Sequence, residues 1–149
     1  MASLLVMSDR AAISRRLERL RPDSARQWGA LAPHAAVMHL IDGMRMTFGE
    51  VRHDVRDSWL NGWFGRWFVI DCPLPWPKGR ITAPAEFFAS AIEHDFDWDR
   101  NRLGEYVERF SVGPHQTWGA SPILGRLTPR QWGKLCWRHL DHHLRQFGC

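Results

Sequence analysis

The residues best suited to chemistry lie between Thr128 and Gly148. His139 and His143 are four residues apart in this stretch. On an α-helix this spacing places two side chains one turn apart on the same face, so both imidazole rings could bind one metal ion. Two hydrogen-bonded core histidines would produce the same pattern. A metal site is favoured only if a third inward-facing histidine lies elsewhere on a helix.

The same stretch carries the signals that begin and end a helix. Thr128 and Gln131 predict a capping box, Pro129 suits the first helical position, and Gly148 suits the residue that follows a helix. At ~100° per residue, one face combines apolar side chains with two histidines: Trp132, Cys136, His139, Leu140, His143 and Phe147. The opposite face carries Lys134, Arg138, Asp141 and Arg145. His142 lies at the edge of the apolar stripe, and we interpret it as a group at the rim of the site.

A second helix, predicted from Pro33 to about Val51, supplies the third inward-facing histidine, His39. The face that contains His39 consists mainly of small residues: Ala32, Ala36, Gly43, Met46, Thr47 and Glu50. Small residues let two helices approach closely or leave room for a ligand. His39 as a hydrogen-bonded core residue is the alternative. Glu50 and Asp42 are the candidates for a general base, and His34 is interpreted as a capping or surface group.

Composition restricts the class of protein. At 149 residues, we expect a single domain over residues 1–149, large enough to bury a core without disulfides. The nine tryptophans predict a thick aromatic core, an aromatic-walled cavity or an interface. The net charge is +4, but the basic residues are interleaved with acidic ones. Because no basic stripe could follow a phosphate backbone, nucleic-acid binding is not expected.

The cysteines and the hydropathy of the chain indicate the cellular compartment in which the protein is expected. The three cysteines, Cys72, Cys136 and Cys149, form no disulfide or metal-binding pattern, which is typical of a reducing cytoplasm. Cys136 falls on the inner stripe and is as well explained as core. The opening residues are too short for the core of a signal peptide. No apolar run approaches ~18 residues, so we expect no membrane partner.

The remaining segments position the histidines. A first helix is predicted from Ser8, as its cap, to Arg21, with an inner stripe of Ile13, Leu17 and Leu20 and a solvated face of Arg15, Arg16 and Arg19. Between Asp57 and Ile70, three tryptophans recur every fourth residue: Trp59, Trp63 and Trp67. This spacing predicts a short helix weakened by Gly62 and Gly65. Its aromatic side chains would form a dimer or core contact, or a lid over a cavity.

A proline-rich loop follows over residues 72–79, because proline removes backbone donors. A long helix is then predicted from Thr82 and Pro84 to about Phe110, with its acidic run at residues 93–99 as a solvated face. Residues 111–127 form a predicted loop that contains His115, and no segment alternates well enough to indicate a sheet. The expected fold is an all-α four-helix bundle, with a long crossover and an extra short Trp-rich helix between the second and third helices.

Several motifs carry a resemblance that runs nearly from end to end: Arg21-Pro-Asp-Ser, Trp28-Gly29, His39-Leu40, Pro75-Trp-Pro-Lys-Gly79, Thr82-Ala-Pro84, Gly125-Arg-Leu-Thr-Pro129, Trp132-Gly133 and His139-Leu-Asp-His-His-Leu-Arg-Gln-Phe-Gly148. With these motifs the chain resembles the DinB/YfiT-like superfamily of bundle-shaped metalloenzymes, and within it a branch of unassigned function. The resemblance implies that His39, His139 and His143 bind a divalent ion. Relatives often have His-Pro where this chain has Ser121-Pro122.

The resemblance and the histidine pattern lead to two expectations of function. The first is a metal-dependent hydrolase or thiol-dependent transferase that acts on a small molecule, with zinc or nickel at the site and a low-molecular-weight thiol as a possible partner. The second is a non-catalytic bundle, a binding or stress-related protein whose histidines are structural. The Trp-rich segment predicts a homodimer, because it offers more aromatic surface than one small bundle can hide.

Overall fold

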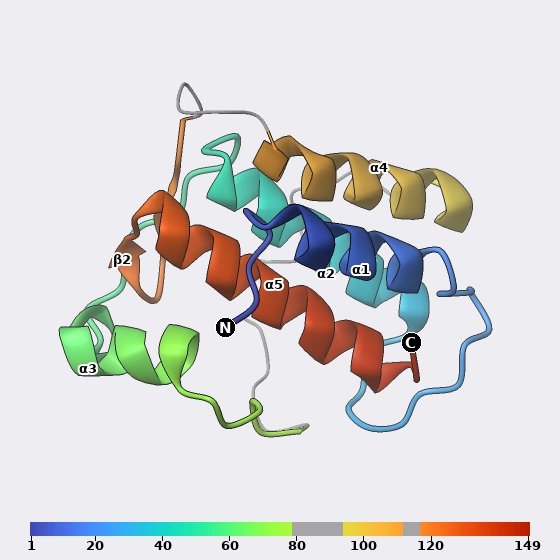
Figure 1. Cartoon of the computed structure of the whole chain (residues 1–149), viewed down its shortest axis with the longest axis horizontal. Helices are drawn as coiled ribbons and strands as arrows, with labels where there is room; N and C mark the ends of the chain where they lie inside the picture. Colours follow the sequence, from blue (N-terminus) through green and yellow to red (C-terminus); the bar gives the residue numbers. More distant parts are fainter. Residues whose placement is uncertain (79–93, 112–116) are drawn as a thin grey trace.

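The computed structural model describes residues 1–78, 94–111 and 117–149 and is mostly helical (Figure 1). Its longer helices are α1 (Met7–Leu17), α2 (Pro33–Thr47), α4 (Phe96–Glu108) and α5 (Pro129–Gln146). Helices α1 and α2 each pack against both α4 and α5. The expectation of a helical fold is therefore confirmed. None of the described helices is long and apolar enough to cross a membrane.

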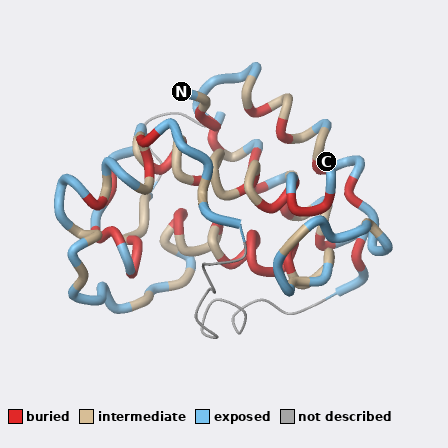
Figure 2. Tube along the Cα trace, turned by 90° about the horizontal axis from the view of Figure 1, so that it is seen from below, coloured by how far each residue is buried: buried red, intermediate tan, exposed pale blue. Residues whose placement is uncertain are grey.

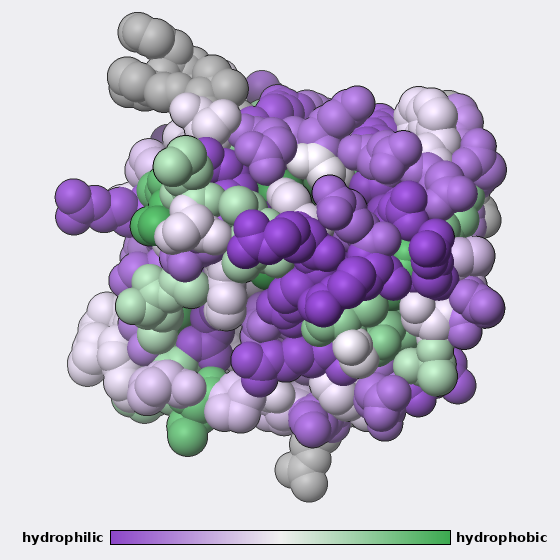
Figure 3. Space-filling view, turned by 45° about the vertical axis from the view of Figure 1, so that its right-hand side comes forward, coloured by the Kyte–Doolittle hydropathy of each residue, from purple (hydrophilic) through white to green (hydrophobic). Residues whose placement is uncertain are grey.

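The core lies where these helices face one another, and the buried parts of the chain gather there (Figure 2). Large, fully buried side chains come from every one of these helices and from the adjoining turns: Leu4, Ile13, Leu20, Val37, Ile41, Leu103, Val107, Trp132, Leu140 and Leu144. On the face drawn in Figure 3, hydrophilic residues cover most of the surface and hydrophobic ones form smaller separate areas. Burial of the apolar faces of the helices supplies most of the driving force for this packing.

Helix α5 begins and ends as the sequence predicts. The side chain of Thr128 accepts from the backbone N–H of Gln131, and the Gln131 side chain accepts from the backbone N–H of Thr128, so the capping box is present. Gly148 follows the helix with a φ of 73°, in the left-handed region that favours glycine. The face opposite the histidines is only partly covered: Arg138 donates to the carbonyl oxygens of Cys72 and Leu74, whereas the Arg145 side chain is 60% exposed. This face of α5 holds the proline-rich loop.

Helix α1 has the predicted phase but different ends. Ile13 is fully buried and Leu17 is 3% exposed, as the predicted stripe requires. The helix begins after Val6, which makes no side-chain capping bond, so Ser8 is not the cap, and it ends at Leu17 rather than at Arg21. Arg16 was also predicted wrongly as solvated. It forms an ion pair with Asp141 at 2.7 Å, which ties α1 to α5.

Helix α2 ends at Thr47, before the predicted end at Val51. Gly49 follows with a φ of 70°, which turns the chain out of the helix. The backbone carbonyl of Met46 lies against Gly119, where a side chain would clash: a Cβ there would fall 2.0 Å from the oxygen. The close approach of the 117–119 segment thus limits the helix.

The Trp-rich segment forms three short helical turns: η1 (Trp59–Asn61), α3 (Trp63–Arg66) and the wider turn η2 (Trp67–Asp71). The predicted helical character is confirmed, but the segment is not one helix, and the first break falls at Gly62. The segment lies at the end of the molecule where α5 begins (Figure 1). Its aromatic side chains are largely exposed: Trp59, Trp63, Phe64, Trp67 and Phe68.

The sequence predicted one long helix ending near Phe110. That prediction is wrong at residues 94 and 95, the first residues described in this region. Residues 94 and 95 are not helical, and the Asp95 side chain accepts from the backbone N–H of Trp98 to cap α4. Acidic residues 95–99 thus form the start of a helix, where carboxylates are favourable. They are not one solvated face either, because Asp99 is fully buried. The proposed start at Thr82 and Pro84, and His115, lie outside the described residues.

A small antiparallel sheet corrects the expectation of no strands. Strand β1 (Ala120–Ser121) pairs with β2 (Gly125–Arg126). Gly125 has a φ of 70°, which closes the tight hairpin. With two residues in each strand, the sheet is too short for an alternating pattern to be visible in the sequence. The helix η4 (Arg109–Ser111) ends the preceding described segment.

Candidate metal centre

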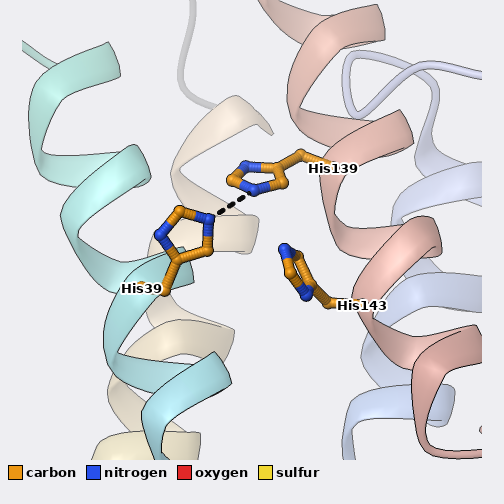
Figure 4. A group of neighbouring side chains, drawn as sticks. All are labelled: His39, His139 and His143. Carbon is orange, nitrogen blue, oxygen red and sulfur yellow. Dashed lines mark hydrogen bonds between the residues drawn. The ribbon is translucent and has the colours of Figure 1, made fainter. Parts of the chain in front are cut away.

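Three histidines from two helices converge between α2 and α5 (Figure 4). His39 comes from α2, and His139 and His143 come from α5. Their candidate ligand atoms all lie within 4.8 Å of one another. Within the described part of the chain, no other His, Cys, Asp or Glu residues form such a group. The structure therefore brings together the three residues that helical phase and family resemblance both selected.

The arrangement follows from the helix repeat and from the pairing of the two helices. His139 and His143 lie one turn apart on α5, with ring centroids separated by 5.0 Å. The His39 ring stands edge-on to both, at centroid distances of 4.8 Å and 5.1 Å. The Nε2 atoms of His39 and His139 are 2.9 Å apart and share a hydrogen bond. All three rings thus face one small space.

Gly43 makes room for one of these rings. A Cβ at position 43 would lie 3.6 Å from the Cε1 and Nδ1 atoms of His139. The imidazole of His139 therefore rests on the backbone of α2, one turn after His39. The sequence left two roles open for the small residues of α2, close approach of another helix or room for a ligand. At Gly43 the structure shows close approach by α5.

Burial keeps the three imidazoles neutral. It lowers the pKa of His39 to about 3 and that of His143 to about 4, with repulsion from neighbouring imidazoles as a further cause. The pKa of His139 also falls well below its usual value, mainly through burial and then through His39 and His143. Neutral imidazole is the form that binds a metal. At neutral pH the three imidazoles are therefore uncharged, so they neither attract nor repel a cation by net charge and are in the form that binds a metal.

Two tryptophans border the histidine cluster on its outer side. Trp76 lies 6.0 Å from His139 and 5.9 Å from His142, measured between ring centroids. Trp28 meets His142 edge-on at 6.1 Å. His142 is half-buried between the two indoles, which agrees with the interpretation of this residue as a rim group. Aromatic surroundings reduce the access of water and strengthen electrostatic interactions inside the site.

The candidate general bases do not join the histidines. Glu50 accepts from the Tyr106 hydroxyl at 2.7 Å and from Arg109. Its pKa is lowered: desolvation opposes the shift, but these hydrogen bonds and the two arginines nearby outweigh it. A carboxylate held in this way is a poor base. Asp42 is buried and lies 3.6 Å from Arg45 across an ion pair.

The other sequence candidates have structural roles. The Cys136 thiol contacts the Thr47 hydroxyl at 3.4 Å, and burial raises its pKa to about 12, so it is inert core. The Ser121 hydroxyl accepts from two backbone N–H groups of the hairpin turn. The Nε2 of His34 lies 2.8 Å from Oδ2 of buried Asp99, and this hydrogen bond joins the starts of α2 and α4. It is neither a simple cap nor a surface group.

Sequence reasoning missed Gln146, which is 3% exposed and lies 3.0 Å from His143 through its Oε1 and the Nδ1 of the ring. Its position three residues after His143 on α5 was the available signal. The sequence contains the Trp28-Gly29 and Pro75-Trp76 motifs, but nothing in it connects either tryptophan with the histidines.

Comparison with known proteins identifies no relative: no family profile, no curated protein and no solved structure matches the chain.

Proposed function

We propose that the protein is a divalent-metal-dependent enzyme that uses His39, His139 and His143 as its metal ligands. The convergence of these three buried imidazoles, with ligand atoms within 4.8 Å of one another, carries the proposal. Buried polar groups are costly unless they are satisfied, so three imidazoles that converge between two helices require partners. A shared cation gives all three rings a partner at once.

The donor set suits catalysis better than structure. Structural zinc sites use four protein ligands, whereas catalytic sites use three and keep a position open for water or substrate. Three neutral imidazoles also leave the full charge of the ion unneutralised. When bound, such an ion polarises a carbonyl, lowers the pKa of a bound water or holds a thiolate. A hydrolase or a thiol-dependent transferase acting on a small molecule is therefore the proposed class of enzyme.

Zinc or nickel is the proposed ion. Imidazole nitrogen is a ligand of intermediate softness that suits both metals, while calcium and magnesium prefer oxygen. Asp42 and Glu50, the acidic groups considered on α2 and just after it, are engaged by arginines, so no carboxylate is available at the cluster from these two residues.

We further propose that the chain is a DinB/YfiT-like four-helix bundle formed by α1, α2, α4 and α5. Two observations support this assignment. Each of α1 and α2 contacts both α4 and α5, as neighbouring helices of a bundle do. The three superfamily ligand positions fall on the three histidines that converge here.

A second candidate is a non-catalytic bundle with structural histidines. The hydrogen bond between the Nε2 atoms of His39 and His139 favours it, because this contact satisfies two buried rings without a metal. The two candidates differ in what replacement of one histidine does. A metal site loses its ion, while a structural pair loses stability.

Metal analysis of protein purified without an affinity tag tests the proposal. We expect about one zinc or nickel per chain in the wild type, and its loss in His39→Ala, His139→Ala and His143→Ala. His142→Ala is the matched control, because the ring is adjacent on α5 but points to the rim. Equal metal content in all four variants, or no binding by the wild type after reconstitution, would contradict the enzyme proposal.

A further inference from the structure

We propose that Gln146 is a positioning residue that fixes His143 in the tautomer able to bind a metal through Nε2. The inference rests on the proposed metal site for its purpose, but the positioning itself is a property of the metal-free protein. It depends on three groups from two distant parts of the sequence: the His143 ring and the Gln146 amide on α5, and the backbone carbonyl of Trp28.

The carbonyl of Trp28 orients the amide. The Gln146 Nε2 lies 2.9 Å from this oxygen, which can only accept a hydrogen bond. The NH2 end of the amide must therefore face Trp28. Its oxygen then faces His143, at 3.0 Å from Nδ1. The reversed amide would place an oxygen against a carbonyl oxygen and an NH2 group against the ring.

The oriented amide oxygen selects the tautomer. Because Oε1 can only accept, the neutral His143 ring must carry its proton on Nδ1 and donate it. Its Nε2 then has a free lone pair on the side of the ring away from Gln146. A metal-binding histidine commonly donates its other N–H to an oxygen in this way, which fixes the ring and raises its basicity.

The turn before α2 holds the amide in place. The backbone N–H of Gln27 donates to the carbonyl of Gln146 at 2.7 Å, so the turn grips the main chain as well as the side chain. Gly29 has a φ of 75°, and a Cβ there would lie 2.7 Å from the Gln146 Nε2. Gly29 is thus required both by its backbone conformation and by the space that the amide fills. This contact gives the Trp28-Gly29 motif a role at the histidine cluster.

Nitrogen-15 NMR of the metal-free protein tests the tautomer directly. We expect the His143 ring to be protonated on Nδ1 in the wild type and to shift toward Nε2 protonation in Gln146→Met, which keeps the length of the side chain but removes both polar atoms. Gln146→Glu, measured at pH 8, keeps an acceptor beside Nδ1 but loses the donor to the Trp28 carbonyl; where the variant is folded, it should restore Nδ1 protonation. Nε2 protonation of His143 in the wild type would overturn the proposal, whatever the metal does.

Zinc titration supplies the second readout. Loss of an outer partner of a metal-binding histidine typically weakens binding roughly 10–100-fold, and we expect this loss in Gln146→Met but not in Gln146→Glu. Arg145→Met is the matched control on the adjacent, 60% exposed position of α5. Unchanged zinc affinity in Gln146→Met, in a folded variant and with a wild type that binds zinc, would overturn the role of Gln146.

If Gln146→Met does not fold, a second variant tests the same proposal. Gly29→Ala displaces the amide from the turn side and leaves the sequence of α5 intact, so it should produce the same shift in the His143 tautomer. The two proposals also fail separately. If His143 is protonated on Nδ1 and no zinc binds, the positioning is supported and the metal-dependent function is not.

Discussion

The Nε2 atoms of His39 and His139 lie 2.9 Å apart, so one ring donates its proton to the other. Two nitrogens bound to a tetrahedral zinc at ~2.0–2.1 Å would be about 3.3 Å apart, and both would need a free lone pair. Metal binding must therefore separate these two atoms slightly and move the shared proton to the other nitrogen of its ring. The three candidate ligand atoms lie within 4.8 Å of one another rather than ~3.3 Å, so the rings would also have to draw closer around an ion.

Metal binding should release almost no protons. Three histidines of ordinary pKa would together release roughly two protons at pH 6. Here burial lowers the pKa of His39 to about 3 and that of His143 to about 4, so the rings are already neutral. Zinc titration calorimetry in buffers of different ionisation enthalpy measures the number directly. With ordinary histidines, zinc affinity would fall below pH ~6.5. Here we expect that fall only near pH 4. Release of two protons at pH 6 would show that the rings are charged.

Stability without metal should fall in acid. The unfolded chain binds a proton to each histidine below ~6.5, whereas folded His39 and His143 bind one only near their lowered pKa values. Because the unfolded state holds more protons, the free energy of unfolding decreases as pH falls from 6.5 toward 4, by up to ~1.4 kcal/mol per pH unit for each group. Denaturant unfolding with a chelator present measures this slope. His39→Gln should reduce it by the share of one histidine, and an unchanged slope would contradict the burial of His39.

Leu17→Ala should destabilise the fold by roughly 2–5 kcal/mol, because it leaves a cavity between α1 and α4. Leu17 is 3% exposed, and its Cδ2 lies 4.0 Å from the Cβ position of Gly104. Chemical denaturation gives the difference. Arg15→Ala on the exposed side of α1 is the control, with an expected change within ~0.5 kcal/mol. Similar values for the two variants would show that the helix is rotated.

Substitutions at Gly43 should separate stability from metal binding. Gly43→Ala adds a methyl group at an ordinary contact distance of 3.6 Å from the His139 ring and improves helix propensity, so stability should rise by up to ~1 kcal/mol with metal retained. Gly43→Leu should push the ring away and abolish binding. Thermal unfolding and metal content are the two measurements. Normal metal content in Gly43→Leu would show that His139 is not held against α2.

A second copy of the chain is the expected partner of the aromatic segment. Trp63 is 82% exposed and Trp59 67%, together with Phe64 at 51%. The charged residues of α3 and η2 are used internally: Arg66 donates to Leu124 and Asp71 pairs with Lys134. An exposed aromatic surface depleted of free charge is typical of the centre of an interface. Light scattering at micromolar concentration should give a dimer for the wild type and a monomer for Trp63→Ser. A wild-type monomer at every concentration would exclude this partner.

Periodicity predicted the parts of the structure that follow from one helix alone. The phase of α5 placed His139 and His143 on one side, because apolar neighbours three and four residues away mark the buried face, and the small residues on one face of α2 marked His39 as inward-facing. The capping box at Thr128 set the start of α5 to the residue. These features depend on local chemistry, which the sequence states directly.

The features that sequence reasoning missed depend on contacts between distant segments. Asp99 reads as part of an acidic surface, yet it is buried because His34 reaches it from another helix. Gln146 reads as an ordinary polar residue at a helix end, yet the turn at Trp28 encloses it. The end of α2 is an exception, because Gly49, which turns the chain out of the helix, is visible in the sequence.

The histidine cluster joins positions that are 100 residues apart in the sequence. The three cysteines are all free, so no disulfide joins these regions. A metal held by both helices would bind the folded chain and not the unfolded one, so it would stabilise the fold by an amount that grows with the free metal concentration, ~2.7 kcal/mol at 100 times its dissociation constant. The persistence of the fold would then follow the supply of metal in the cell, whereas a disulfide would make it follow the redox state.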